Sequence, residues 1–171
     1  RLSHDYTRVK NTEALYYLGY LYQMTGRTAE AEEALWAATW TPDFKHPAFY
    51  QLAVAAVRAK DYPKALELIE QSLYVGARDL QALSVKAYIL RQLGKQSEAL
   101  ATLDYIQSID PLDYWSEAEQ SFLQQGDASF LKGTRSYRSE GLIAMQELLE
   151  VVANYMTMGA TQDALTLLDA A

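Results

Sequence analysis

The hydrophobic residues of this chain recur at helical spacing. The clearest sets are Leu15, Leu18 and Tyr22, and Leu66, Ile69 and Leu73. Residues at i, i+3, i+4 and i+7 lie on one face of an α-helix, whereas a half-buried strand alternates at every second residue. The pattern therefore predicts amphipathic helices rather than strands.

The helical pattern repeats with a period of 34 residues. A fixed period of this length indicates a repeat architecture. One column of small residues at this spacing consists of Gly19, Ala53, Ala87 and Ser121. A second consists of Ala31, Ala65 and Ala99, followed four residues later by Leu35, Ile69 and Leu103. Two helices that cross at close range need a residue without bulk at the contact. We therefore predict helical hairpins, with Gly19 and Ala31 as the meeting points within the first.

A third column, formed by Gly26, Lys60 and Gly94, marks the predicted end of the first helix in each hairpin. A left-handed residue is expected there, and glycine adopts that conformation most easily. Lys60 departs from glycine, and Asp61 after it is expected to cap the next helix. Prolines are placed similarly: Pro47 and Pro63 in predicted first turns, and Pro111 at a first helical position with Asp110 as its N-cap.

These columns resemble the tetratricopeptide repeat (TPR) family. The resemblance rests on Leu15, Leu18, Gly19, Tyr22, Gly26, Ala31, Leu35 and Pro42 in the first unit, on Leu83, Ala87, Leu90, Gly94, Ala99, Leu103 and Pro111 in the third, and on Leu148, Val152, Tyr155, Gly159, Ala164 and Leu168 in a final unit out of register. It implies an all-α, right-handed solenoid of about five antiparallel helical hairpins in a single domain, 1–171. The repeats are expected at about 12–45, 46–79, 80–113, 114–144 and 145–171.

The unit at 114–144 departs from the pattern, because Gly126, Gly133 and Gly141 interrupt its second half. We expect a degenerate repeat with a stunted second helix and a loop, which either bends the solenoid or is a tolerated insertion. The run ALATLDYIQSIDPLDYWSEAE also looks like the TPR tail of bacterial proteins that begin with a sugar-mutarotase-like β-sandwich. That resemblance implies a fragment of a longer chain, with any sugar chemistry outside it.

Composition narrows the classes of function. A net charge of −7 argues against nucleic acid and anionic membrane surfaces as partners, because both require clustered Lys and Arg. With no Cys and with only His4 and His46, the sequence predicts no metal, no cofactor and no enzyme activity, and His46 is expected to be a surface or capping residue. No apolar run approaches the roughly 20 residues that span a bilayer. The compartment stays open, with the cytoplasm favoured, and nothing indicates the oligomeric state.

The predicted function is binding. The resemblance to TPR proteins implies that the first helix of each hairpin lines a concave groove. The predicted groove residues are Tyr16, Tyr17, Tyr20, Gln23, Tyr50, Gln51, Arg58, Gln81, Ser84, Tyr88, Arg91 and Trp115. Tyrosine and arginine bring large contact areas and polar groups, so we expect a protein or peptide ligand whose carboxylates pair with Arg58 and Arg91. A glycan stacked on the tyrosines is the alternative ligand, and any single tyrosine could instead pack between repeats.

A second hypothesis is a structural arm that docks on its own upstream domain or dimerises, including an accessory arm of a carbohydrate-active multidomain protein that aids glycan binding. Solenoid ends expose apolar faces unless they are capped. In the last helix, Leu165 and Leu168 are expected to pack on the preceding helix, leaving Gln162, Thr166 and Asp169 outside. If the chain seals its own groove, the predicted groove tyrosines are core residues.

Overall fold

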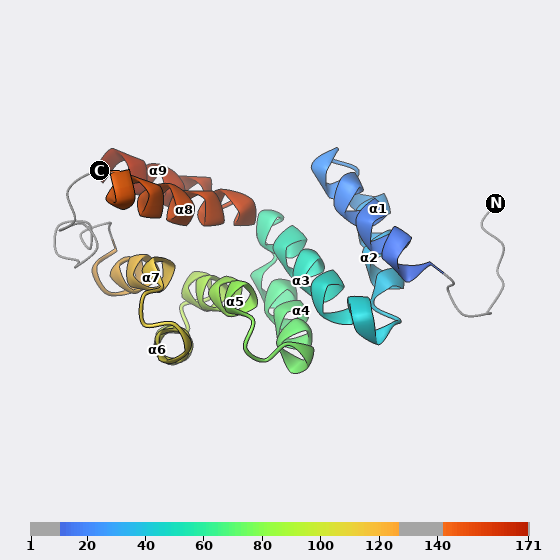
Figure 1. Ribbon diagram of the computed structural model, residues 1–171, viewed down its shortest axis with the longest axis horizontal. Helices are drawn as coiled ribbons and strands as arrows, with labels where there is room; N and C mark the ends of the chain where they lie inside the picture. The colour runs from blue at the N-terminus through green and yellow to red at the C-terminus, as the bar shows by residue number, and fades with distance from the viewer. Residues whose placement is uncertain (1–10, 127–141, 171) are drawn as a thin grey trace.

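The computed structural model describes residues 11–126 and 142–170 (Figure 1). Nine α-helices and no strand are found in these two ranges. The helices are α1 (Thr12–Met24), α2 (Thr28–Ala38), α3 (Pro42–Arg58), α4 (Tyr62–Val75), α5 (Leu80–Gln92), α6 (Gln96–Ile109), α7 (Tyr114–Gln125), α8 (Leu142–Met158) and α9 (Thr161–Ala170). The all-α prediction is confirmed, and the predicted loop of the fourth unit lies largely outside the described residues.

The turns inside the first three helix pairs have the same geometry. The second helices begin at Thr28, Tyr62 and Gln96, so the sequence period reappears in the backbone. Before them, Gly26, Lys60 and Gly94 adopt left-handed φ angles of 74°, 61° and 71°. In each turn the next backbone N–H donates to a carbonyl five residues back, over 2.9 Å (Arg27 to Tyr22, Asp61 to Ala56 and Lys95 to Leu90). The predicted turn column is confirmed, including its lysine.

The left-handed lysine leads to a stability prediction. A side chain costs about 1–2 kcal/mol in this conformation. Glycine relieves that strain but loses more backbone entropy on folding, so Lys60→Gly should raise the free energy of unfolding by about 0.5–1 kcal/mol. Urea unfolding followed by circular dichroism measures it. Ala59→Gly is the matched control, because Ala59 has an ordinary φ of −78° and glycine there should only destabilise. A loss of stability in Lys60→Gly would contradict the argument.

Two of the helix starts differ from the prediction. Helix α3 begins at Pro42, so Pro47 lies inside it rather than in its first turn. The helix tolerates Pro47 because the carbonyl left without its N–H partner belongs to Asp43, in an exposed first turn. In contrast, Pro63 does lie in the first turn of α4, as predicted.

The start of α7 is the second difference. Asp113, not Asp110, is its N-cap and accepts from the backbone N–H of Ser116 over 2.8 Å. Pro111 lies in a turn that the Asp113 N–H closes onto the carbonyl of Asp110 over 3.3 Å. Asp followed by Pro suits the first two positions of such a turn as well as it suits a helix start, and the sequence alone did not separate the two.

The small columns are packing positions. Gly19, Ala53, Ala87 and Ser121 are buried, as are Ala31, Ala65 and Ala99. The large column of Leu35, Ile69 and Leu103 is fully buried in the core. A Cβ built on Gly19 would lie 2.7 Å from Cγ of Leu35, which is closer than real atoms approach. The sequence explanation of Gly19 as a close helix contact is confirmed, with Leu35 as the group that it meets.

Helices α8 and α9 form a C-terminal hairpin that lies across the preceding helices (Figure 1). Helix α8 packs against both α3 and α7, although α3 lies far from it in the sequence. On α9, Ala164 and Leu167 are buried, while Leu165 and Leu168 are about half exposed. The predicted inner face of α9 is therefore wrong. Leu167 lies four positions after Asp163, which pairs with α5, and three after Ala164, so it shares a helix face with each of them.

Candidate functional site

A groove of about 640 Å³ lies between α1, α3, α5, the start of α7 and α8. Eight of the twelve predicted residues line it: Tyr20, Gln23, Tyr50, Gln51, Arg58, Gln81, Ser84 and Trp115. We call this space the inner groove. Helix α3 contributes Tyr50, Val54 and Arg58 to the lining. These residues come together because they recur at four-residue spacing on one face of the helix.

Helix α8 supplies the groove wall that the sequence did not predict. Glu150, Asn154, Met156, Thr157 and Met158 line the inner groove from this helix. The repeat period gives no position for α8, because its unit is out of register. Sequence reasoning therefore found the wall formed by the first helices and missed the opposite one.

Hydrogen bonds from two side chains fix the walls of the inner groove. The Gln23 side-chain amide donates to the backbone carbonyl of Gln51 over 3.0 Å and joins α1 to α3. Arg58 donates from Nε and Nη2 to the carbonyl of Thr157 over 3.1 and 2.7 Å. A guanidinium is favoured at the C-terminal end of α8, where unpaired carbonyls carry partial negative charge. Arg58 therefore holds α8 in place through two of its donors and keeps its positive charge.

The remaining charges of the inner groove are negative. Asp113 and Glu150 line it, and no ion pair to either carboxylate is found within residues 11–126 and 142–170. Burial raises the pKa of Asp113, and hydrogen bonds from Ser116 oppose the shift. The sequence expectation was that Arg58 and Arg91 would pair with carboxylates of a ligand, whereas two carboxylates of the chain itself line this groove.

Trp115 lines the floor of the inner groove with only 3% of its surface exposed. Its indole N–H is buried and has no hydrogen-bond acceptor in the described part of the chain. A buried donor without a partner costs free energy. The indole nitrogen is itself shielded, so Trp115 contributes packing to the groove wall and offers no exposed donor.

The two tyrosines at the start of α1 lie elsewhere. Tyr16 packs against Phe44 of α3, with ring centroids 5.5 Å apart, and burial raises its pKa. Tyr17 is 54% exposed and does not line the inner groove. Tyr50 lines the groove but is partly buried, and this burial raises its pKa as well.

Tyr88 and Arg91 belong to the interior instead of the groove. Arg91 Nε lies 2.5 Å from Oε1 of Glu119, which is fully buried, and Arg91 Nη2 lies 3.1 Å from Oδ2 of Asp163 on α9. The hydroxyl of Tyr155 on α8 donates to Oε2 of Glu119 over 2.5 Å. The C-terminal hairpin thus covers Tyr88 and Arg91, which corrects their predicted exposure to a ligand.

The sequence does contain a signal for this interior network. One period before Arg91 stands Val57, and one period before Glu119 stands Val85, and both valines are buried. Opposite charges at positions that are apolar in the preceding repeat indicate a buried ion pair. Burial raises the pKa of Glu119, while Arg91 and the Tyr155 hydroxyl act in the opposite direction.

His46 belongs to a second polar cluster, in which its side chain stays 24% exposed and its Nδ1 lies 3.0 Å from the carbonyl of Ser72 in the last turn of α4. Its Nδ1 lies 2.8 Å from Oγ of Ser72, and its Nε2 lies 3.1 Å from Oδ2 of Asp79. This order of groups is that of a hydrolase triad. However, Ser72 is fully buried and its hydroxyl also lies 3.0 Å from the carbonyl of His46. The cluster joins α3, α4 and the N-cap of α5.

No set of three acidic or histidine side chains suited to a metal ion occurs in the two described ranges. In those ranges, no helix is both long and apolar enough to cross a bilayer. No family model matches the chain, and no curated protein matches it either. The argument for function therefore rests on the geometry of the inner groove.

Proposed function

We propose that the protein is a non-catalytic interaction module that binds an extended segment of a partner protein in the inner groove. We further propose that the helices form a right-handed TPR solenoid of about five hairpins in one domain, 1–171. The observation that carries the proposal is the convergence of tyrosine and glutamine side chains, Tyr20, Tyr50, Gln51 and Gln81, on one groove of about 640 Å³.

The lining suits a peptide in extended conformation. Tyr20 and Met24 of α1 and Met156 of α8 all line the groove and are exposed, so they offer apolar area to a ligand side chain. Gln51 and Gln81 can pair with backbone amides of the ligand. These groups favour a peptide with an apolar side chain flanked by accessible backbone.

The charges favour a basic peptide over an acidic one. Two carboxylates, Asp113 and Glu150, line the inner groove against one cation, Arg58, whose guanidinium is directed to the carbonyl of Thr157. Arg91, the other cation expected there, is bound to Glu119 and Asp163. Charge complementarity therefore directs a Lys or Arg of the ligand toward the end formed by α7 and α8.

The test is selection of random twelve-residue peptides on the folded chain, followed by calorimetric titration of the best peptide. We expect Tyr20→Ala and Gln81→Ala to weaken binding about tenfold or more, since central contacts of this kind are worth about 1–2 kcal/mol. Glu150→Gln should weaken it less and reduce its dependence on salt. Tyr74→Ala is the matched control, because Tyr74 is 85% exposed on α4 and lies outside the groove.

Equal losses in Tyr20→Ala and Tyr74→Ala would overturn the groove as the binding site. Failure to select any peptide would favour a second candidate, the structural arm. One observation supports that candidate: α1 exposes Tyr17, Leu18 and Leu21 in a continuous apolar stripe. Such a stripe suits docking on another domain, including one of a carbohydrate-active protein.

A further inference from the structure

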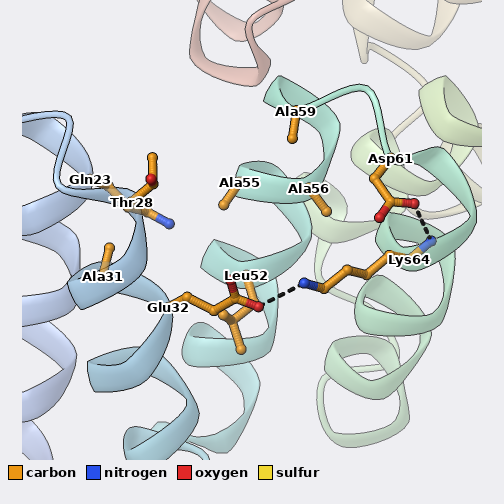
Figure 2. Close-up of a pocket in the computed structure, with 10 residues that line it drawn as sticks. All are labelled: Gln23, Thr28, Ala31, Glu32, Leu52, Ala55, Ala56, Ala59, Asp61 and Lys64. Atoms are coloured by element: carbon orange, nitrogen blue, oxygen red, sulfur yellow. Dashed lines mark hydrogen bonds and ion pairs between the residues drawn. The ribbon is translucent and has the colours of Figure 1, made fainter.

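A second space, separate from the inner groove, opens between the first two helix pairs. It measures about 300 Å³, and its apolar lining comes from Ala31, Leu52, Ala55, Ala56 and Ala59. We call it the alanine pocket. Figure 2 shows α2 on one side and α3 on the other, with Lys64 of α4 reaching across to Glu32 of α2.

The chain itself shows what normally fills such a space. One period later, between the second and third helix pairs, Ala55 and Ala59 are replaced by Ile89 and Leu93, and Thr28 is replaced by Tyr62. Ile89 is fully buried, and Leu93 and Tyr62 pack against the core. The Tyr62 ring contacts the Tyr88 ring at 6.4 Å. Ala56 likewise corresponds to the fully buried Leu90, so the first seam lacks an aromatic ring and three branched aliphatic side chains that the second seam possesses.

The charged side chains at the mouth of the alanine pocket interact with one another or with the backbone. Lys64 Nζ lies 2.7 Å from Oε1 of Glu32, and this contact lowers the pKa of Glu32. The carboxylate of Asp61 accepts from the backbone N–H of Lys64 at the start of α4. These charges therefore have partners already, and the apolar floor offers no charge to a ligand. A ligand with an unpaired charge would be disfavoured inside.

We propose that the alanine pocket binds a compact, uncharged apolar ligand that contains an aromatic ring. The ligand takes the place of the ring and aliphatic groups that are missing from this seam, and its size is that of a molecule with two or three rings. A volume of about 300 Å³ is at the lower end for ligand pockets. The site is independent of the proposed peptide groove, although Gln23 lines both spaces.

The test uses N-phenyl-1-naphthylamine, an uncharged probe whose emission rises in apolar surroundings. Titration into the whole chain should give a saturable rise. Ala55→Ile with Ala59→Leu, which installs the residues of the next seam, should weaken binding at least tenfold while helicity is kept. Ala101→Leu adds an equal side chain on the exposed side of α6 and should leave binding unchanged. Tyr20→Ala should also leave it unchanged.

Three results would overturn the proposal. The first is the absence of a saturable rise in emission with the parent chain. The second is equal probe affinity in the parent and in the double variant Ala55→Ile with Ala59→Leu. The third is a loss of affinity in Tyr20→Ala as large as in the double variant, which would place the probe in the inner groove. If the double variant does not fold, Thr28→Tyr replaces it, since Thr28 lies at the exposed rim and Tyr62 holds the equivalent place. In that case, weaker probe binding by Thr28→Tyr supports the site, and unchanged probe binding refutes it.

Discussion

Arg91→Met is expected to lower the free energy of unfolding by about 3–5 kcal/mol at neutral pH. The substitution keeps most of the side-chain length but removes the cation that faces the fully buried carboxylate of Glu119. A carboxylate left inside without its counterion loses most of its compensation for desolvation, and the Tyr155 hydroxyl alone supplies little. Urea unfolding, followed by circular dichroism, measures the loss.

The loss in Arg91→Met should depend on pH in a defined direction. Burial already raises the pKa of Glu119, and removing Arg91 removes the main group that opposes this shift. The folded variant then holds a proton that the unfolded chain releases between the unfolded and folded pKa values. Stability therefore falls as pH rises through that window, so the deficit against the parent should be smaller at pH 5 than at pH 8.

Two further variants separate the charge effect from the loss of packing. Arg78→Met is the control, because Arg78 is exposed and makes no ion pair within the described ranges; it should change stability by no more than about 0.5 kcal/mol. Arg91→Met combined with Glu119→Gln should recover at least half of the loss, since no charge is then left buried. If the single and double variants were equally unstable and showed no pH dependence, the network would contribute through shape alone.

The repeat period correctly predicted the features that depend on interactions within a single helical hairpin. The left-handed turns at Gly26, Lys60 and Gly94, and the buried small columns, follow from backbone conformation and helix contact within a single hairpin. The error at Pro47 has a local origin too, because Pro42 and Pro47 are both compatible with a first turn and only the packing of the whole helix decides between them.

Long-range packing could not be predicted in the same way. The sequence placed Tyr88 and Arg91 on an open face because the period treats every repeat alike, whereas the C-terminal hairpin lies over this face in the structure. Eight groove residues were found because they share one face of successive helices. The α8 wall was missed, because its contacts with α3 join residues about 100 positions apart, such as Arg58 and Thr157.

Gly19→Leu is expected to destabilise the chain by about 2–3 kcal/mol through overpacking of the contact between α1 and α2. A Cβ at this position would lie 2.7 Å from Cγ of Leu35 and 3.2 Å from its backbone nitrogen. The backbone atom cannot rotate away, so a rotamer change of Leu35 does not relieve the crowding. Leucine also gains helix propensity of roughly 0.8 kcal/mol over glycine, which the strain has to exceed.

A complementary pair tests this explanation of Gly19→Leu, since bulk moved across the contact should restore part of the fit. Leu35→Ala alone should cost about 2–5 kcal/mol by leaving a cavity in the core. In the double variant Gly19→Leu with Leu35→Ala, the loss should be smaller than the sum of the two by at least about 1 kcal/mol. Ala14→Leu, on the exposed side of α1, is the matched control and should stay near the parent. Additive losses would mean that Gly19 and Leu35 do not share one contact, and the small column would then need another explanation.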